Sequence, residues 1–202
     1  MIKRLGIFGG AFDPVHKGHT QSLKYITDLK IIDEIQVIPN YASPHNKEIQ
    51  TDEKHRLKML EIAFKEIKNL LNNFKLKKNC DAIFIDLHGE AASEKQAFAN
   101  MVDGKVTAVL GTHTHVPTSD LRILPYGTAF QTDTGMCGDY DSVIGMNKDN
   151  SINRFMKKDS VKHFPAKGEA SLSGVIVDCN IETGLAIKIK SYIFGGCLNN
   201  TN

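Results

Sequence analysis

Histidines that could handle phosphate occur in two separate parts of this chain, and the first pair is His16 and His19. They end the run Gly9-Gly10-Ala11-Phe12-Asp13-Pro14-Val15-His16-Lys17-Gly18-His19. Two glycines let a phosphate approach the backbone closely, and a helix beginning near Lys17 would present its unpaired N–H groups to the same anion. The imidazoles could then donate hydrogen bonds to phosphate oxygens as negative charge develops during nucleotidyl transfer. Taken singly, each histidine also fits an ordinary turn beside two structural glycines.

The second group consists of His88, His113 and His115, which follow two apolar runs at residues 82–85 and 106–110. His113 and His115 alternate along backbone that we expect to be extended, so their side chains should point the same way. Three imidazoles with carboxylates nearby suit a divalent transition metal, which could activate water or hold a phosphate. The alternative for a single histidine is a polar loop residue.

Alternating strands and helices are expected to position both groups. Apolar runs at 5–8 and 34–39 end in glycine or proline, which is typical of buried strands, and helical periodicity covers 17–29 and 52–71. This βαβα order calls for a parallel sheet with right-handed crossovers.

The pattern then restarts with a strand at 82–85, a helix at 93–101 and a strand at 106–110. Ser93 is the expected N-cap of that helix. Residues 123–132, 174–177 and 186–193 are rich in β-branched side chains and favour an antiparallel sheet, and residues 151–157 favour a short helix.

The composition is that of an ordinary globular protein, with 202 residues, 41% hydrophobic and 24% charged. No apolar stretch approaches the roughly 20 residues that span a bilayer, and we expect no signal peptide. The four cysteines show no CxxC spacing, which favours a reducing, cytoplasmic setting. The expected partners are nucleotide small molecules, with neither nucleic acid nor membrane.

Charge is distributed unevenly between the two parts of the chain. Residues 1–78 hold 14 Lys and Arg against 9 Asp and Glu, whereas residues 79–202 hold 11 against 14. The sign changes near the basic tract at 75–78. This indicates either a boundary between modules or a solvated helix end.

The N-terminal run resembles the nucleotidyltransferase superfamily with the HxGH signature, and within it the nicotinate-mononucleotide adenylyltransferases, over about residues 1–72. Pro44-His45 with Lys47, and the segment 53–60, support this resemblance. The chain contains no counterpart of that family's late ISSTxxR-like run, and it has no tryptophan. The resemblance implies an ATP site assisted by Mg²⁺, with His16 and His19 as the catalytic residues. It also implies that the nucleotide contacts are Gly9, Gly10, Phe12, His16, His19, His45 and Lys47.

The later part, from about residue 81 to 194, resembles the calcineurin-like metallophosphoesterases of the YmdB type. The residues that carry the resemblance lie at 84–95, 111–116, 122–125 and 132–136. It implies a two-metal phosphodiesterase acting on cyclic or diester nucleotides. It also implies that His88, His113 and His115 bind a divalent transition metal such as Fe or Mn. The GNH run that belongs to the N-terminal half of these enzymes does not occur in the chain.

Together these patterns predict an α/β fold with two parts. Residues 1–74 would be a partial, Rossmann-like βαβα segment, and residues 80–195 the C-terminal half of a calcineurin-like α/β/β/α phosphoesterase with an antiparallel β-sheet. The strands expected at 5–9, 34–38, 82–87 and 106–110 should join one sheet, which would bring all the histidine motifs to one edge.

Three functions remain open at this point. The first interpretation is adenylyl transfer from ATP in NAD biosynthesis, impaired by truncation. The alternative is a metal-dependent phosphodiesterase or phosphatase of the YmdB type that acts on cyclic nucleotides. The third is an inactive fusion of two truncated enzymes.

Overall fold

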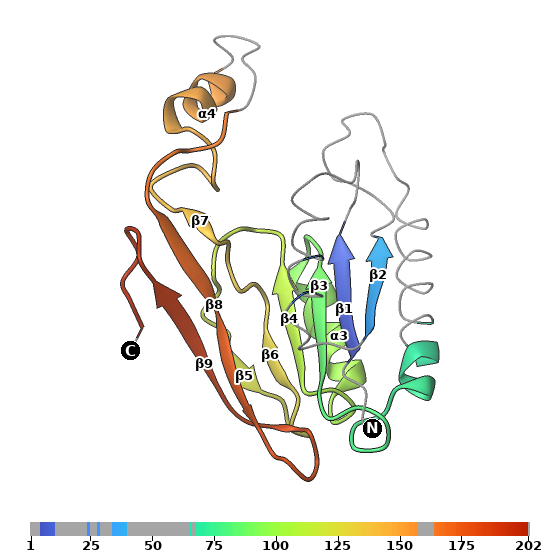
Figure 1. The fold of residues 1–202 in the computed structure, drawn as a ribbon. Coiled ribbons are helices and arrows are strands. Elements are labelled where there is room, and N and C mark those ends of the chain that lie inside the picture. Colours follow the sequence, from blue (N-terminus) through green and yellow to red (C-terminus); the bar gives the residue numbers. More distant parts are fainter. Residues whose placement is uncertain are drawn as a thin grey trace.

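The computed structural model of the chain describes residues 5–10, 24, 28, 34–39, 65, 68–156 and 164–201. These residues form two β-sheets and two helices whose first and last residues are both described (Figure 1). The strands are β1 (Leu5–Gly10), β2 (Glu34–Pro39), β3 (Ile83–His88), β4 (Ala108–Thr112), β5 (Arg122–Ile123), β6 (Ala129–Gln131), β7 (Gly138–Asp139), β8 (Ala170–Cys179) and β9 (Ala186–Phe194). The helices are α3 (Ala92–Val102) and α4 (Lys148–Phe155), and residues 68–73 form the end of a further helix.

The larger sheet has the strand order β2-β1-β3-β4-β6-β5. All neighbouring pairs are parallel except β5 with β6. The four strands expected near residues 5, 34, 82 and 106 therefore do lie in one sheet, with β1 of the N-terminal segment hydrogen-bonded to β3. The smaller sheet, β7-β8-β9, is antiparallel.

Alternating residues of the central strands face two different layers. On one face of the larger sheet, Val109 of β4 and Phe130 of β6 join Phe98, Ala99 and Val102 of α3 in the main core. The other face is lined by smaller side chains and meets the second sheet. Its contacts are made by Ala108, Ala129 and Ala186, with Leu110, Val177 and Ile189 packed around them. The described residues therefore build a helix–sheet–sheet sandwich of mixed α/β type.

Two expectations about these elements were wrong. Ser93 is not the N-cap of α3: the helix begins one residue earlier, Ala91 occupies the cap position, and no side chain caps the helix. Residues 123–132 do hold an antiparallel pair, β5 with β6, but it lies in the larger sheet and not in the antiparallel sheet of β7, β8 and β9. A turn at Gly127, where φ is 99°, reverses the chain between β5 and β6, and β6 then continues the parallel sheet beside β4.

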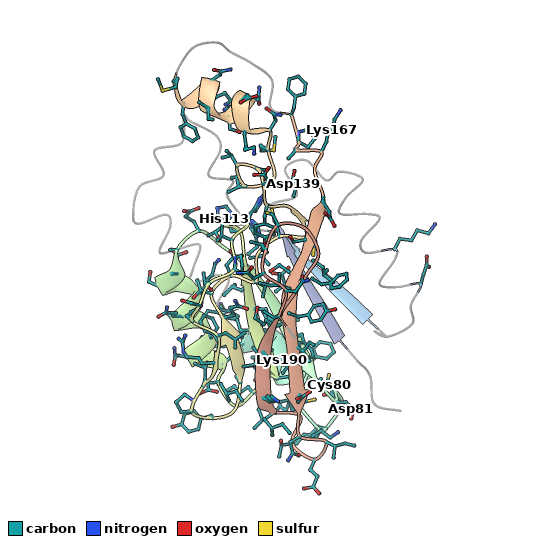
Figure 2. The ribbon with its side chains drawn as sticks, turned by 90° about the vertical axis from the view of Figure 1, so that its left-hand side faces the viewer. Cys80, Asp81, His113, Asp139, Lys167 and Lys190 are labelled. Atoms are coloured by element: carbon teal, nitrogen blue, oxygen red, sulfur yellow. The ribbon has the colours of Figure 1, made fainter. Side chains whose placement is uncertain are left out.

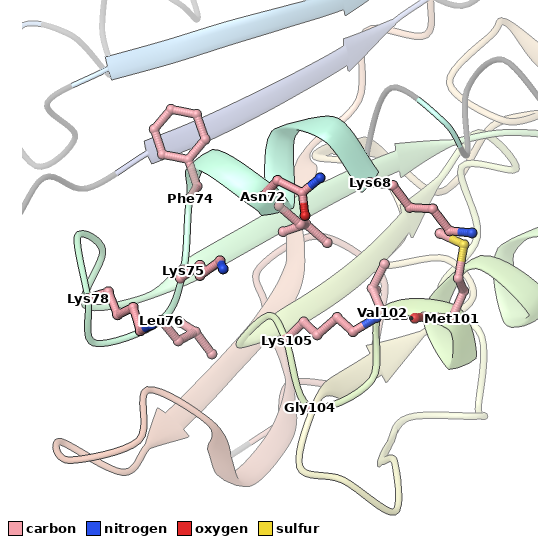
Figure 3. A pocket seen from close by; sticks show the side chains of 11 residues that line it. Lys68, Asn72, Phe74, Lys75, Leu76, Lys78, Met101, Val102, Gly104 and Lys105 are labelled. Carbon is pink, nitrogen blue, oxygen red and sulfur yellow. Dashed lines mark hydrogen bonds between the residues drawn. The ribbon is translucent and has the colours of Figure 1, made fainter.

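A cavity of about 600 Å³ opens at the end of the sheet where β3 and β4 begin (Figure 3). Four lysines line it (Lys68, Lys75, Lys78 and Lys105), and none of its lining residues is acidic. Two helices end here, at Asn73 and Val102, and Lys105 Nζ lies 3.4 Å from Met101 O. Cations are stabilised beside the exposed carbonyls of helix C-termini, which accounts for lysines at this place.

None of the four cysteines forms a disulfide, and all four lie in the described part of the chain. Among the described residues, no helix is both long and apolar enough to cross a membrane.

Candidate functional site

His88 and His113 meet where β3 and β4 end. His88 is the last residue of β3, and His113 follows the last residue of β4, so parallel pairing of these strands places both rings at one edge of the sheet. His113 Nδ1 lies 3.0 Å from His88 Nε2, and the ring planes are inclined at 83°. Figure 2 shows His113 far from Cys80 and Asp81, which lie at the opposite end of the molecule. The structure thus brings together two of the three histidines that were predicted to bind a metal.

A chain of hydrogen bonds fixes the proton positions on His88. The Thr112 hydroxyl donates to Asp86 Oδ1 at 2.8 Å, so its oxygen is left to accept a hydrogen bond from His88 Nδ1 at 3.0 Å. His88 therefore carries its proton on Nδ1 and presents an Nε2 lone pair to His113.

Both nitrogens of His113 face an acceptor. Nδ1 faces the His88 lone pair, and Nε2 lies 2.5 Å from Glu90 Oε2. His113 therefore lies between the His88 ring and the Glu90 carboxylate. Glu90 is 74% exposed whereas His113 is 17% exposed, so the series of contacts leads from the partly buried carboxyl of Asp86 out to solvent.

Burial controls the titration of the inner groups. The pKa of His88 is lowered to about 4, mainly because burial disfavours the imidazolium and secondly because His113 and Lys95 add positive charge nearby. Burial also raises the pKa of Asp86, against the lowering effect of the hydrogen bond from Thr112. His88 is thus neutral near pH 7, as its role as an acceptor requires.

His115 does not join the other two histidines in the way that the alternation predicted. Residues 113–116 form bends rather than a strand, with φ of 135° at His113 and 67° at His115. The chain turns here because the buried Asp133 carboxylate accepts a hydrogen bond from the Thr114 N–H at 2.8 Å. His115 Nδ1 consequently lies 2.8 Å from Ile144 O, on another loop. The expectation of extended backbone at His113 and His115 was wrong, and Nδ1 of the two rings contacts different parts of the chain.

The donor chemistry nevertheless fits a metal at these rings. A carbonyl only accepts, so His115 donates from Nδ1 to Ile144 O and presents Nε2, as His88 does. Metal-binding histidines typically have one nitrogen tied to an oxygen in this manner. However, the described part of the chain contains no group of three His, Cys, Asp or Glu side chains that are close enough together to hold a metal ion. The ligand set His88, His113 and His115 therefore stays a prediction.

Several residues of this site were not singled out by the sequence. Thr112, Lys95 and Asp133 lie in the segments that carry the metallophosphoesterase resemblance, as do Asp86 and Glu90, but the sequence assigned none of them a role. Helical periodicity could have identified Lys95, because positions 95, 98, 99 and 102 share one face of the helix and the other three residues are apolar. A lysine on such a face indicates a buried polar contact.

The nucleotide site predicted in the N-terminal run lies mostly outside the described residues. Gly9 and Gly10 end β1, and their backbone pairs with β2. His16, His19, Phe12, His45 and Lys47 fall outside the described part of the chain. Their predicted roles are therefore not tested.

The sequence matches the family of YmdB-like proteins over residues 49–192. The chain belongs to the YmdB-like protein family. A 2′,3′-cyclic-nucleotide 2′-phosphodiesterase of Bacillus subtilis is 49% identical over 113 residues, which are 56% of this chain and 43% of that protein. A crystal structure of a phosphatase from Mycoplasma pneumoniae superposes with a TM-score of 0.59 at 42% identity, covering 65% of this chain and 46% of the other.

A second similarity is confined to a smaller part of this YmdB-like chain. A probable nicotinate-nucleotide adenylyltransferase of Streptococcus mutans is 45% identical over 69 residues, or 34% of this chain and 33% of the relative. The chain therefore spans less than half the length of each of these curated relatives. The similarity to the phosphodiesterase covers more of this chain than the similarity to the adenylyltransferase. It therefore favours our alternative interpretation, phosphodiester hydrolysis, over our first one, adenylyl transfer.

Proposed function

We propose that this YmdB-like protein acts on phosphodiesters of nucleotides, as a metal-dependent phosphodiesterase whose substrates include 2′,3′-cyclic nucleotides. The observation that carries the proposal is the pair of imidazoles 3.0 Å apart at the carboxyl edge of a parallel sheet. Open α/β sheets bind their ligands at that edge. The similarity to the Bacillus subtilis phosphodiesterase supplies the substrate class.

The residues that would hold the divalent metal are His88, His113 and His115. A metal bound there would polarise a phosphate oxygen and lower the pKa of a bound water. Asp86 and Thr112 keep the His88 ring oriented with its Nε2 lone pair outward. A metal ion binds the unprotonated nitrogen of an imidazole, and the exposed Glu90 carboxylate would help to orient the His113 ring through its contact with Nε2.

The proposal is tested by hydrolysis of 2′,3′-cyclic AMP by the purified chain with added Mn²⁺, followed by chromatography of the products. His88→Ala and His113→Ala should each lower kcat/KM by about 100-fold or more, the size expected for loss of a group that acts in the reaction. Lys190→Ala, on β9, is the matched control and should retain the rate.

A metal measurement on the same preparations makes the test independent of the substrate chosen. The wild-type chain should hold Mn or Fe after dialysis, and His113→Ala should hold less. The proposal fails if the histidine variants hydrolyse the nucleotide as fast as the wild-type chain, or if the wild-type chain binds neither metal.

Adenylyl transfer remains a second candidate because of the similarity to the Streptococcus mutans protein. Pyrophosphate release from ATP and nicotinate mononucleotide, with Mg²⁺, measures it directly. We expect any such rate to fall in His19→Ala, and a rate unaffected by that change would remove the candidate.

A further inference from the structure

Lys95 is a charged side chain enclosed beneath the histidine site. It lies in the first turn of α3 and is only 1% exposed. Its Nζ donates to Thr112 O at 2.9 Å, to Thr132 O at 3.0 Å and to Asp133 Oδ2 at 3.4 Å. An ammonium group has three N–H bonds, so all of them are engaged. The lysine thus links the ends of β4 and β6, the two strands whose following loops approach the site.

Asp133 continues this linkage to the turn between the histidines. Its side chain is fully buried. While Oδ2 faces Lys95 and the Thr114 N–H, Oδ1 accepts a hydrogen bond from the Gly135 N–H at 2.9 Å. Thr114 is the residue between His113 and His115, so one carboxylate fixes the backbone at the point where the two rings diverge.

The backbone on either side of Thr114 adopts conformations that L-residues seldom take. The φ angles of 135° at His113 and 67° at His115 cost free energy, of the order of 1–3 kcal/mol each, unless the surroundings enforce them. The hydrogen bond from the Thr114 N–H to Asp133 holds the backbone between these two residues, and contacts of the Thr114 hydroxyl with the Val116 backbone lie beside it. Burying an ion pair is also costly compared with apolar side chains of the same size, so packing alone does not account for Lys95 and Asp133.

We infer that Lys95 and Asp133 are positioning residues of the histidine site: together they set the turn at Thr114 that directs His113 toward His88 and His115 toward Ile144. Lys95 holds the carboxylate in place, and the carboxylate holds the turn. The inference concerns the shape of the site, and it holds whichever reaction the site performs.

Amide hydrogen exchange of the full chain, resolved by NMR, tests the inference without any activity assay. In Lys95→Met, which keeps the side-chain length but removes the charge, Thr114 N–H should exchange at least about tenfold faster relative to Leu124 N–H. Leu124 is the internal reference because its N–H bonds to Thr128 O at 2.8 Å, away from the site. The imidazole signals of His113 and His115 should shift as well. Lys105→Met is the matched control, because Lys105 is exposed and lies at the end of the sheet where β3 and β4 begin, away from the histidines, and it should change neither.

A double variant separates positioning from stability. Lys95→Met alone leaves a buried carboxylate without its cation, and adding Asp133→Asn removes that charge, so the free energy of unfolding should recover toward the wild-type value. An amide has one accepting oxygen in place of two, so it cannot hold both Thr114 and Gly135. Exchange at one of these two N–H groups should therefore stay fast in the stabilised double variant.

Either of two results would overturn the inference. One is wild-type exchange at Thr114 in Lys95→Met. The other is recovery of exchange at both Thr114 and Gly135 together with stability in the double variant, which would leave the pair with a purely stabilising role. If Lys95→Met does not fold, the double variant decides alone.

Discussion

The Thr112 hydroxyl performs two tasks at once, because it donates to the partly buried Asp86 and accepts from His88. Thr112→Val keeps the shape of the side chain but removes both bonds. The free energy of unfolding should fall by about 1 kcal/mol, because a partly buried carboxyl loses its donor. The pKa of Asp86, already raised by burial, should rise further. Urea denaturation measures the first effect and carboxyl NMR the second.

The same change should weaken any Mn²⁺ affinity by about 10–100-fold, the effect usual for loss of a residue that orients a ligating histidine. Thr112→Ser retains the hydroxyl and is the control, so its metal affinity should remain near that of the wild-type chain. Equal affinities in Thr112→Val and Thr112→Ser would show that the hydroxyl does not orient His88.

At the scale of single residues, the sequence predicts which strand ends carry the histidines, but it does not predict which atoms each imidazole contacts. His88 and His113 follow two strands that local patterns identify, and parallel pairing brings such residues together. The direction of His115 depends on a carboxylate at Asp133 and on a carbonyl at Ile144, 18 and 29 residues further along the chain. No periodicity within residues 106–116 contains that information.

At the scale of elements, β4 approaches Thr132 too closely for any side chain at Gly111. A Cβ built there would collide with the Thr132 carbonyl and would also press on Lys95. Gly111→Ala should therefore lower the free energy of unfolding by about 3 kcal/mol, since the end of β4 must move outward. Urea denaturation at constant pH gives this value.

Gly174→Ala is the matched control for this prediction. Gly174 lies in β8, and a Cβ at that position would meet no heavy atom within 4 Å. Its effect on the free energy of unfolding should stay within about 0.5 kcal/mol. Similar losses in the two variants would contradict the close approach between β4 and Thr132.

Element prediction succeeded where a buried face imposes a simple pattern. The apolar runs at residues 5, 34 and 82 and the paired runs of β8 and β9 are strands in the structure. It failed for Ser93, because a shift of the N-cap by two residues, to Ala91, has little energetic signature. It also failed for the sheet that residues 123–132 join, because the pairing of β6 with β4 depends on packing against α3 and β9. Such packing is not visible in local sequence.

At the scale of the whole molecule, the larger sheet depends on strands from both parts of the chain. β1 covers the edge of β3 at Ile83, Phe84 and Ile85. A chain that starts at residue 75 should expose the backbone groups of that edge and self-associate, as unprotected edges do. Sedimentation velocity at several concentrations measures this, and the full chain is the reference.

A point variant tests the same contact without removing residues. Ile7→Pro deletes a backbone donor from the middle of β1 and should lower the free energy of unfolding by about 3 kcal/mol. A shortened chain that stays monomeric, or a proline variant as stable as the wild-type chain, would mean that β1 contributes little to the fold.

The pairing of Leu5 with Ile83 also sets an order in time. The two residues are 78 positions apart, so a ribosome adding about 5–20 residues per second makes Ile83 about 4–16 s after Leu5. During that interval β1 and β2 have been synthesised but the strand that completes their sheet has not. During synthesis, the free edges of β1 and β2 could therefore pair with other chains. A chaperone that binds this segment for a few seconds would prevent such pairing.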